Sequence, residues 1–165
     1  MSNQLYFTCP SDFLEPVIRK ENGRKVYFLN ALANSFEFTP EVIDEINRLV
    51  EKRTINKITF VLADNNQLIF DALNKGDFST LKSMEGFFEE LSLLNSTTAP
   101  LWQSGHNKLQ VLSYYLESKT KELKRSMAER SSNEITFETK IYTRQTGKSL
   151  SIPTALFLLK PFQLN

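Results

Sequence analysis

Two short, largely apolar segments on either side of one amphipathic helix limit the fold more than any other feature of the sequence. Lys25 to Ala31 is nearly all apolar rather than alternating, as in a strand covered on both faces, and Lys57 to Leu62 is similar in length. Between them, Thr39-Pro40-Glu41 has the residues of a helix start. One apolar stripe follows, made of Val42, Ile43, Ile46, Leu49 and Val50. Strand, helix and strand with short links predict a parallel, right-handed βαβ unit.

The rest of the chain extends this unit into one domain over residues 1–165. We expect an α/β fold with a mostly parallel central sheet flanked by helices, ending in a C-terminal antiparallel or edge strand. The further strands are Gln4 to Cys9, the alternating segment Glu134 to Thr143, and Leu150 to Leu159, which Pro153 interrupts. The further helical segments are Phe78 to Leu94 and Asn107 to Arg130, and Leu68 to Leu73 is either a helical or a turn segment.

The longest of these helices, Asn107 to Arg130, has an apolar stripe and a charged end. The predicted buried stripe is Leu109, Leu112, Tyr115 or Leu116, and Leu123. The charge run from Lys119 to Arg130 is predicted to be a solvated face. Two aromatic clusters, Phe36-Glu37-Phe38 and Phe87-Phe88, are predicted to lie in the core or at a subunit contact.

Charge and cysteine content restrict the partners and the compartment. The chain has 20 Lys and Arg against 19 Asp and Glu, a net charge of +1, so neither nucleic acid nor an anionic membrane is expected as a partner. Cys9 is the only cysteine, so no internal disulfide can form and a cytoplasmic location fits best. The first residues do not resemble a signal peptide, and no apolar run approaches the ~20 residues that span a bilayer.

Four stretches, in order and spacing, resemble the β-class carbonic anhydrases. Tyr6 to Pro16 is similar to the stretch that carries the first zinc ligand of the family, with Cys9 and Glu15-Pro16 at the family spacing. Gly23 to Ala31 resembles the strand that closes in Arg-Asn-Ala, although Leu29 stands at the arginine position. Ile58 to Leu73 resembles the strand and helix start that carry the other two ligands. The fourth match comprises Asn107 to Leu116, Ile141-Tyr142 and Thr146-Gly147.

The resemblance implies a zinc site from which most ligands are missing. The family binds zinc through two cysteines and a histidine, whose positions fall on Cys9, Ala63 and Asn66 in this chain. The family's aspartate beside the metal falls on Ser11, and its arginine partner on Phe13. Alanine has no lone pair to offer, and a neutral amide is a poor zinc ligand. Without zinc, no water is activated at neutral pH, so we expect no metal, no cofactor and no hydration chemistry.

What remains is a candidate remnant pocket, for which two interpretations stay open at each residue. It comprises Cys9, Ser11, Asp12, Ala63, Asp64 and Asn66. Cys9 is either a buried small hydrophobe or a reactive thiol, and Asp12 is either a turn or cap carboxylate or an acid. The Asp64-Asn65-Asn66 segment is either a helix-capping loop or part of a small-molecule pocket. His106, the only histidine, is either a loop residue or a ligand or general base.

Three functions follow as expectations. The first is a zinc-free carbonic-anhydrase-like protein without carbon dioxide hydration activity, acting as a binding or interaction module with no catalytic residues. The resemblance implies a homodimer, and the remnant pocket leaves room for a small molecule. The second is an enzyme of another class that uses the pocket around Cys9 and Asp12. The third is a structural partner with a filled pocket and an extensive apolar surface patch.

Overall fold

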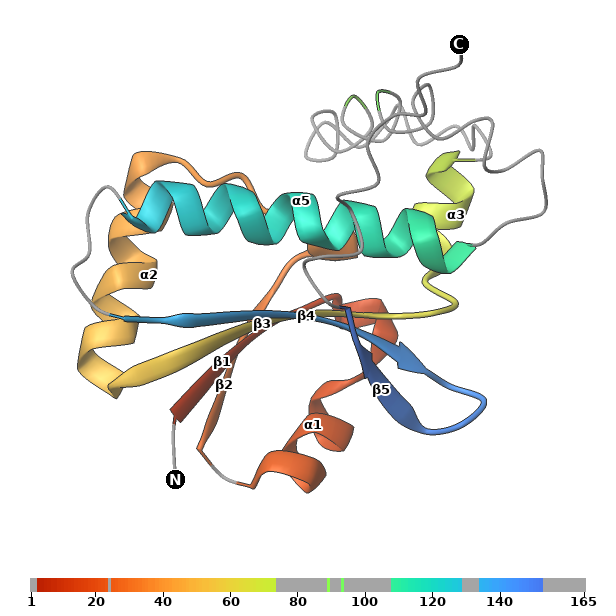
Figure 1. Cartoon of the computed structure of the whole chain (residues 1–165), viewed down its shortest axis with the longest axis horizontal. Coiled ribbons are helices and arrows are strands. Elements are labelled where there is room, and N and C mark those ends of the chain that lie inside the picture. The colour runs from red at the N-terminus through yellow and green to blue at the C-terminus, as the bar shows by residue number, and fades with distance from the viewer. Residues whose placement is uncertain are drawn as a thin grey trace, which may run out of the picture.

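A twisted, mostly parallel sheet forms the centre of the molecule. The computed structural model describes residues 3–23, 25–73, 89, 93, 108–128 and 134–152. Within them the sheet has five strands in the order β2-β1-β3-β4-β5. Their bounds are β1 Asn3–Thr8, β2 Val26–Asn30, β3 Ile55–Ala63, β4 Thr136–Thr143 and β5 Lys148–Ser151. The first four strands pair in parallel, and β5 pairs antiparallel with β4 (Figure 1). The predicted fold class is confirmed.

Helices cover the two faces of the sheet unequally. Helix α1 (Glu15–Asn22) lies on one face, and α2 (Pro40–Arg53), α3 (Gln67–Leu73) and α5 (Lys108–Ala128) lie on the other (Figure 1). Two short 3-10 turns, η1 (Pro10–Asp12) and η2 (Leu32–Asn34), follow β1 and β2. The sequence did not predict α1, because Glu15 to Asn22 is mostly polar and has no apolar stripe long enough to indicate a helix.

The larger core lies beneath α2, α3 and α5 and is centred on phenylalanines. The rings of Phe7 in β1 and Phe60 in β3 stack with their centroids 4.4 Å apart. Phe36 packs edge-on against Phe7 at 4.9 Å, and Phe38 meets Phe60 at 6.3 Å. The core interpretation of the first aromatic cluster is therefore confirmed. The second cluster, Phe87-Phe88, lies outside the described residues.

The predicted start of α2 is also confirmed. Thr39 has extended backbone angles, and its hydroxyl accepts a hydrogen bond from the backbone N–H of Val42 at 3.4 Å. Pro40 is the first helical residue, and Ile43, Ile46 and Val50 are buried. A polar cap and an apolar stripe thus place this helix over the sheet as the spacing predicted.

Helix α5 follows its prediction in the middle and departs from it at two residues. Leu112, Tyr115, Leu116 and Leu123 are fully buried. Leu109 remains 38% exposed, because the burial of α5 begins at Val111 and Leu112, after the first helical residues. Lys119, predicted to start the solvated face, is only 7% exposed.

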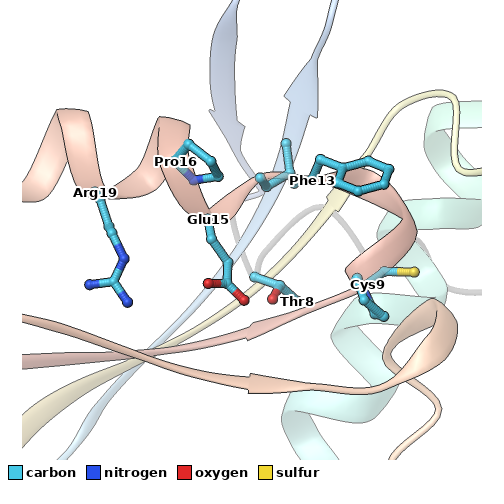
Figure 2. Close-up of a pocket in the computed structure, with 8 residues that line it drawn as sticks. Thr8, Cys9, Phe13, Glu15, Pro16 and Arg19 are labelled. Atoms are coloured by element: carbon cyan, nitrogen blue, oxygen red, sulfur yellow. The ribbon is translucent and has the colours of Figure 1, made fainter.

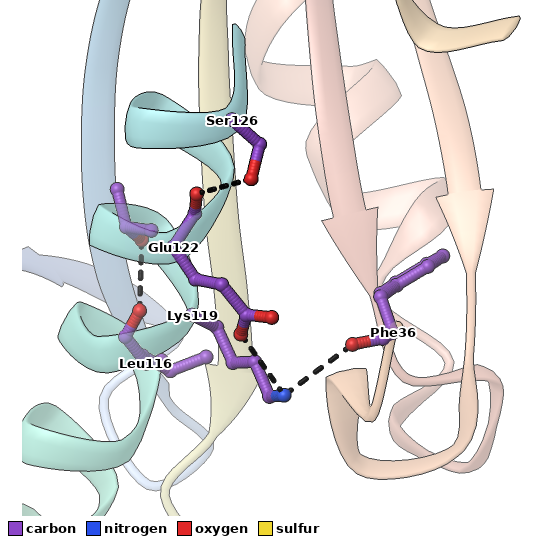
Figure 3. A network of polar contacts seen from close by, with 6 residues as sticks. Phe36, Leu116, Lys119, Glu122 and Ser126 are labelled. Atoms are coloured by element: carbon purple, nitrogen blue, oxygen red, sulfur yellow. Dashed lines mark hydrogen bonds and ion pairs between the residues drawn. The ribbon is translucent and has the colours of Figure 1, made fainter. Parts of the chain in front are cut away.

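The burial of Lys119 has a clear structural reason (Figure 3). Its ammonium group donates to the backbone carbonyl of Phe36 at 3.3 Å and pairs with the Glu122 carboxylate at 3.4 Å. The long side chain therefore connects α5 to the segment that precedes α2. The neighbouring charged residues Lys121, Glu122, Lys124 and Arg125 are exposed, as predicted.

Strand β4 has the predicted alternation, with Thr139 and Ile141 buried. Gly147, in the turn to β5, has a φ of +64°, which glycine adopts without strain. The predicted segment Leu150 to Leu159 is described only up to Ile152. The predicted helix Phe78 to Leu94 is described only at Glu89 and Leu93, which are helical, and His106 lies outside the described residues. Within the described part of the chain, none of the helices has both the length and the apolar character needed to cross a bilayer.

Candidate functional site

The strand order creates one topological switch point. From β1 the chain enters α1 on one face of the sheet, whereas from β3 it enters α3 on the opposite face. Because β1 and β3 are parallel neighbours, their carboxyl ends diverge around a common crevice. In open α/β sheets ligands bind at such crevices. Four of the predicted site residues, Asp12, Ala63, Asp64 and Asn66, lie here.

The Asp12 carboxylate fills this crevice. Its Oδ2 accepts a hydrogen bond from the backbone N–H of Ala63 at 2.8 Å, and its Oδ1 accepts one from Asn66 Nδ2 at 2.9 Å. Asp12 is 2% exposed and Asn66 is 1% exposed. The turn after β1 and the loop after β3 are therefore joined through a single buried carboxylate, in an arrangement that we call the Asp12 clasp.

Asn66 also begins helix α3. Its side-chain Oδ1 accepts a hydrogen bond from the backbone N–H of Ile69 at 3.2 Å, the pattern of an N-cap residue. Its side-chain N–H already donates a hydrogen bond to Asp12, so both the oxygen and the nitrogen of the side-chain amide have a partner. The helix-capping interpretation of the Asp64-Asn65-Asn66 loop is confirmed at Asn66.

Arg144 encloses the clasp from the turn after β4, and sequence reasoning missed it. One guanidinium nitrogen donates to the backbone carbonyl of Asp12 at 2.5 Å, and Nε donates to Asn65 Oδ1 at 2.9 Å. The backbone N–H of Arg144 lies 3.4 Å from Asp64 Oδ1. The only sequence signal was its place beside the Thr146-Gly147 hairpin, and nothing in the spacing pairs it with Asp12.

Burial is the largest influence on the pKa of Asp12. Removal from water raises the pKa of this carboxyl above its ordinary value. The hydrogen bonds from Ala63 and Asn66 and the positive charge of Arg144 act in the opposite direction but do not cancel the burial. The clasp therefore holds an anion at a cost in solvation, which its donors offset in part.

Cys9 and Ser11 face a different neighbour, the η2 turn. The Cys9 side chain is 1% exposed, and its Sγ accepts a hydrogen bond from the backbone N–H of Ala33 at 3.0 Å. The Ser11 hydroxyl lies 2.9 Å from the same sulfur. Ala33 adopts a left-handed conformation with φ of 53°, within the turn that supplies this donor. The buried-hydrophobe interpretation of Cys9 agrees with this geometry.

The donor set at the switch point does not fit a zinc ion. Ala63 offers only a backbone N–H, which donates to Asp12, and the amide of Asn66 is used at both ends. The Cys9 sulfur already contacts Ala33 and Ser11. A structural or catalytic zinc needs at least three thiolate, imidazole or carboxylate ligands. Among the residues that the structure describes, no three such side chains gather to hold a metal.

The comparisons with known proteins agree with this architecture. No protein-family model and no curated protein sequence matches the chain. Among solved structures, the β-carbonic anhydrase CafD of Aspergillus fumigatus aligns with a TM-score of 0.74 at 14% identity, over 92% of this chain and 90% of that one.

Two further structures give the same result. A tetrameric β-carbonic anhydrase of Sordaria macrospora aligns with a TM-score of 0.72 at 13% identity, covering 92% of this chain and 81% of its own. CafA of Aspergillus fumigatus reaches 0.70 at 16% identity, over 97% and 77%. With its strand order and its switch point between β1 and β3, this chain has the fold of a β-carbonic anhydrase.

Proposed function

We propose that this chain is a zinc-free, carbonic-anhydrase-like protein that does not hydrate carbon dioxide and acts as a binding or interaction module. The observation that carries the proposal is the Asp12 clasp. The two positions at which the resemblance places zinc ligands after β3, Ala63 and Asn66, both donate hydrogen bonds to Asp12 instead. At all three positions the polar groups already have partners within the protein, Asp12 for Ala63 and Asn66 and the pair Ala33 and Ser11 for Cys9, which supports a fold that has no need of the ion.

The proposal includes a homodimer in the cytoplasm. The solved Sordaria macrospora relatives are described as tetrameric, which supports self-association for this fold. The net charge of +1 gives no strong repulsion between copies.

Metal analysis coupled to a carbon dioxide hydration assay tests the proposal. The protein is purified with a chelator, reloaded with zinc, desalted and analysed for metal per chain. Hydration is followed by stopped flow with a pH indicator. We expect no stoichiometric zinc and a rate equal to the uncatalysed one, because no water is activated.

CafD of Aspergillus fumigatus, taken through the same steps, is the positive control for reloading and assay. One zinc per chain together with hydration above background would overturn the proposal. In that case, Cys9→Ser and His106→Ala variants would identify whether either side chain holds the metal.

The alternative of a different enzyme that uses Cys9 and Asp12 makes a separate prediction, namely rapid alkylation of Cys9 at neutral pH. We expect slow alkylation by iodoacetamide in the folded protein, because the sulfur is buried and contacts Ala33 and Ser11. The urea-unfolded protein provides the reference rate. Faster reaction in the folded state than in urea would favour the enzyme.

A further inference from the structure

A hollow lies between α1 and the end of β1, next to the Asp12 clasp. It has a volume of about 410 Å³. Helix α1 supplies Glu15, Pro16 and Arg19, and β1 with its following turn supplies Thr8–Pro10, Phe13 and Leu14. Of the six site residues predicted from the sequence, it includes only Cys9. The Cys9 sulfur points away from Glu15 and Arg19, so the hollow is a separate site (Figure 2).

The hollow carries one anionic side chain that is held in place from one side only. The Thr8 hydroxyl donates to Asn30 Oδ1, and Asn30 Nδ2 donates to Glu15 Oε1 at 2.7 Å. This chain of hydrogen bonds fixes the Glu15 carboxylate over the end of the strands. Among the described residues, the second oxygen of Glu15, Oε2, receives no hydrogen bond.

The hollow also carries one cationic side chain whose donors are available. The Arg19 guanidinium lies over the Phe28 ring, 4.7 Å from its centroid, which restricts its position without using its N–H groups. In the described part of the chain, no carboxylate forms an ion pair with it. Both charged groups extend from α1 toward the same side of the hollow (Figure 2).

The remaining wall is apolar, and part of it is exposed. Phe13 is 78% exposed although it is a large hydrophobic residue, and its backbone is left-handed with φ of 51°. Pro10, Leu14 and Pro16 continue the apolar lining. A molecule seated here would meet a cation, an anion and an apolar surface within one hollow of a size typical of small-molecule sites.

We propose that this hollow binds a free α-amino acid with an apolar side chain. The ligand carboxylate pairs with the Arg19 guanidinium, whose planar fork matches a carboxylate in a bidentate manner. The ligand ammonium group donates to Glu15 Oε2, and its side chain covers Pro16 and Phe13. A zwitterion fits better than a simple anion or cation, because each of those would meet one like charge in the hollow.

Calorimetric titration with three probes of similar size tests the inference. L-Phenylalanine is expected to bind at least about tenfold more tightly than phenylacetate or phenethylamine, since each of the latter lacks one charged contact. The titrations use protein treated with a chelator, and they are repeated after zinc loading. Binding is expected to be the same in both, so this result is independent of the metal analysis.

Two charge-removing variants and one control sharpen the test. Arg19→Gln should lower the affinity for L-phenylalanine at least about tenfold, and it should not lower the affinity for phenethylamine. Glu15→Gln keeps an oxygen that can accept the hydrogen bond from Asn30. It should lower the affinity for L-phenylalanine but raise the affinity for phenylacetate. Lys20→Gln removes a charge from an exposed neighbour on α1 and should leave the affinity within about twofold.

Three results would overturn the inference. The first is the absence of saturable L-phenylalanine binding up to about 10 mM, a range that covers even weak millimolar ligands. The second is equal affinity of the protein for all three probes. The third is an equal loss of L-phenylalanine affinity in Arg19→Gln and Lys20→Gln. Circular dichroism of each variant shows whether it is folded.

Discussion

The two charged sites that follow β1, the Asp12 clasp and the hollow under α1, have similar residue types but opposite degrees of closure. In the crevice between β1 and β3, the Asp12 carboxylate meets two buried donors, and Arg144 covers it. Under α1, the Glu15 carboxylate meets one donor, and Arg19 has no acidic partner among the described residues. A satisfied network fixes structure, whereas unsatisfied charges at an open surface remain available to a ligand. The Asp12 clasp therefore serves stability, and the hollow under α1 serves recognition.

Removing the carboxylate from each site should give the largest contrast. Asp12→Ala leaves the Ala63 N–H and the Asn66 amide buried without an acceptor, so we expect a loss of about 2–4 kcal/mol in the free energy of unfolding. Glu15→Ala, at the open hollow, should cost less than about 1 kcal/mol. Urea denaturation of the two variants measures both. Equal losses would show that the Asp12 clasp does not stabilise the fold.

Tyr6 tests the layer beneath α1 through the alkaline pH dependence of stability. Its hydroxyl donates to Gln4 Oε1 at 3.0 Å, and its side chain is 2% exposed. Burial, followed by the negative charges of Glu138 and Glu21, raises the pKa of Tyr6 to about 12 from 10.0. The folded state thus favours the neutral phenol, and this stabilisation is complete below pH 10 and is lost as the pH rises toward 12.

The expected loss across that window is about 2–3 kcal/mol, from the difference of about two pKa units. Thermal or urea unfolding between pH 9 and pH 12 measures it. Tyr6→Phe should flatten the curve. An unchanged slope in Tyr6→Phe would contradict the assignment.

Substitution of Phe13 should give the smallest change in stability. It should also affect ligand binding and stability in opposite directions. A left-handed conformation costs an L-residue other than glycine about 1–2 kcal/mol. Because the Phe13 ring is largely exposed, its packing adds little to the free energy of unfolding. Phe13→Gly should stabilise the fold by up to about 1 kcal/mol, since the higher entropy of glycine in the unfolded chain offsets part of the gain. It should also weaken L-phenylalanine binding. Phe13→Ala retains the backbone strain and should not stabilise, so equal stabilisation by both would contradict this explanation.

Sequence reasoning predicted the parts of the fold that depend on local patterns. The apolar strands β1 and β3 and the Thr39-Pro40 start of α2 follow from composition and spacing within a few residues. Asn66 could be placed in a capping loop for the same reason. These features are fixed by neighbours along the chain, so a single sequence is enough to find them.

The features that were missed depend on residues far apart in the sequence. Arg144 reaches Asp12 only because β4 pairs with β3, and Lys119 is buried only because Phe36 offers it a carbonyl. Helix α1 lacks a strong apolar stripe, since Ile18 is its one buried residue. The hollow that α1 forms with β1 was therefore missed with the helix itself.

The pairing of β3 with β4 also has a consequence for how the chain is made. Lys57 pairs with Thr136, so the edge of β3 stays without its partner until residue 136 has been synthesised and released from the ribosome. During that interval, the apolar strand Ile55–Ala63 presents unpaired backbone groups to other nascent chains. Chaperone contact while β3 lacks this partner should therefore influence the yield of native protein.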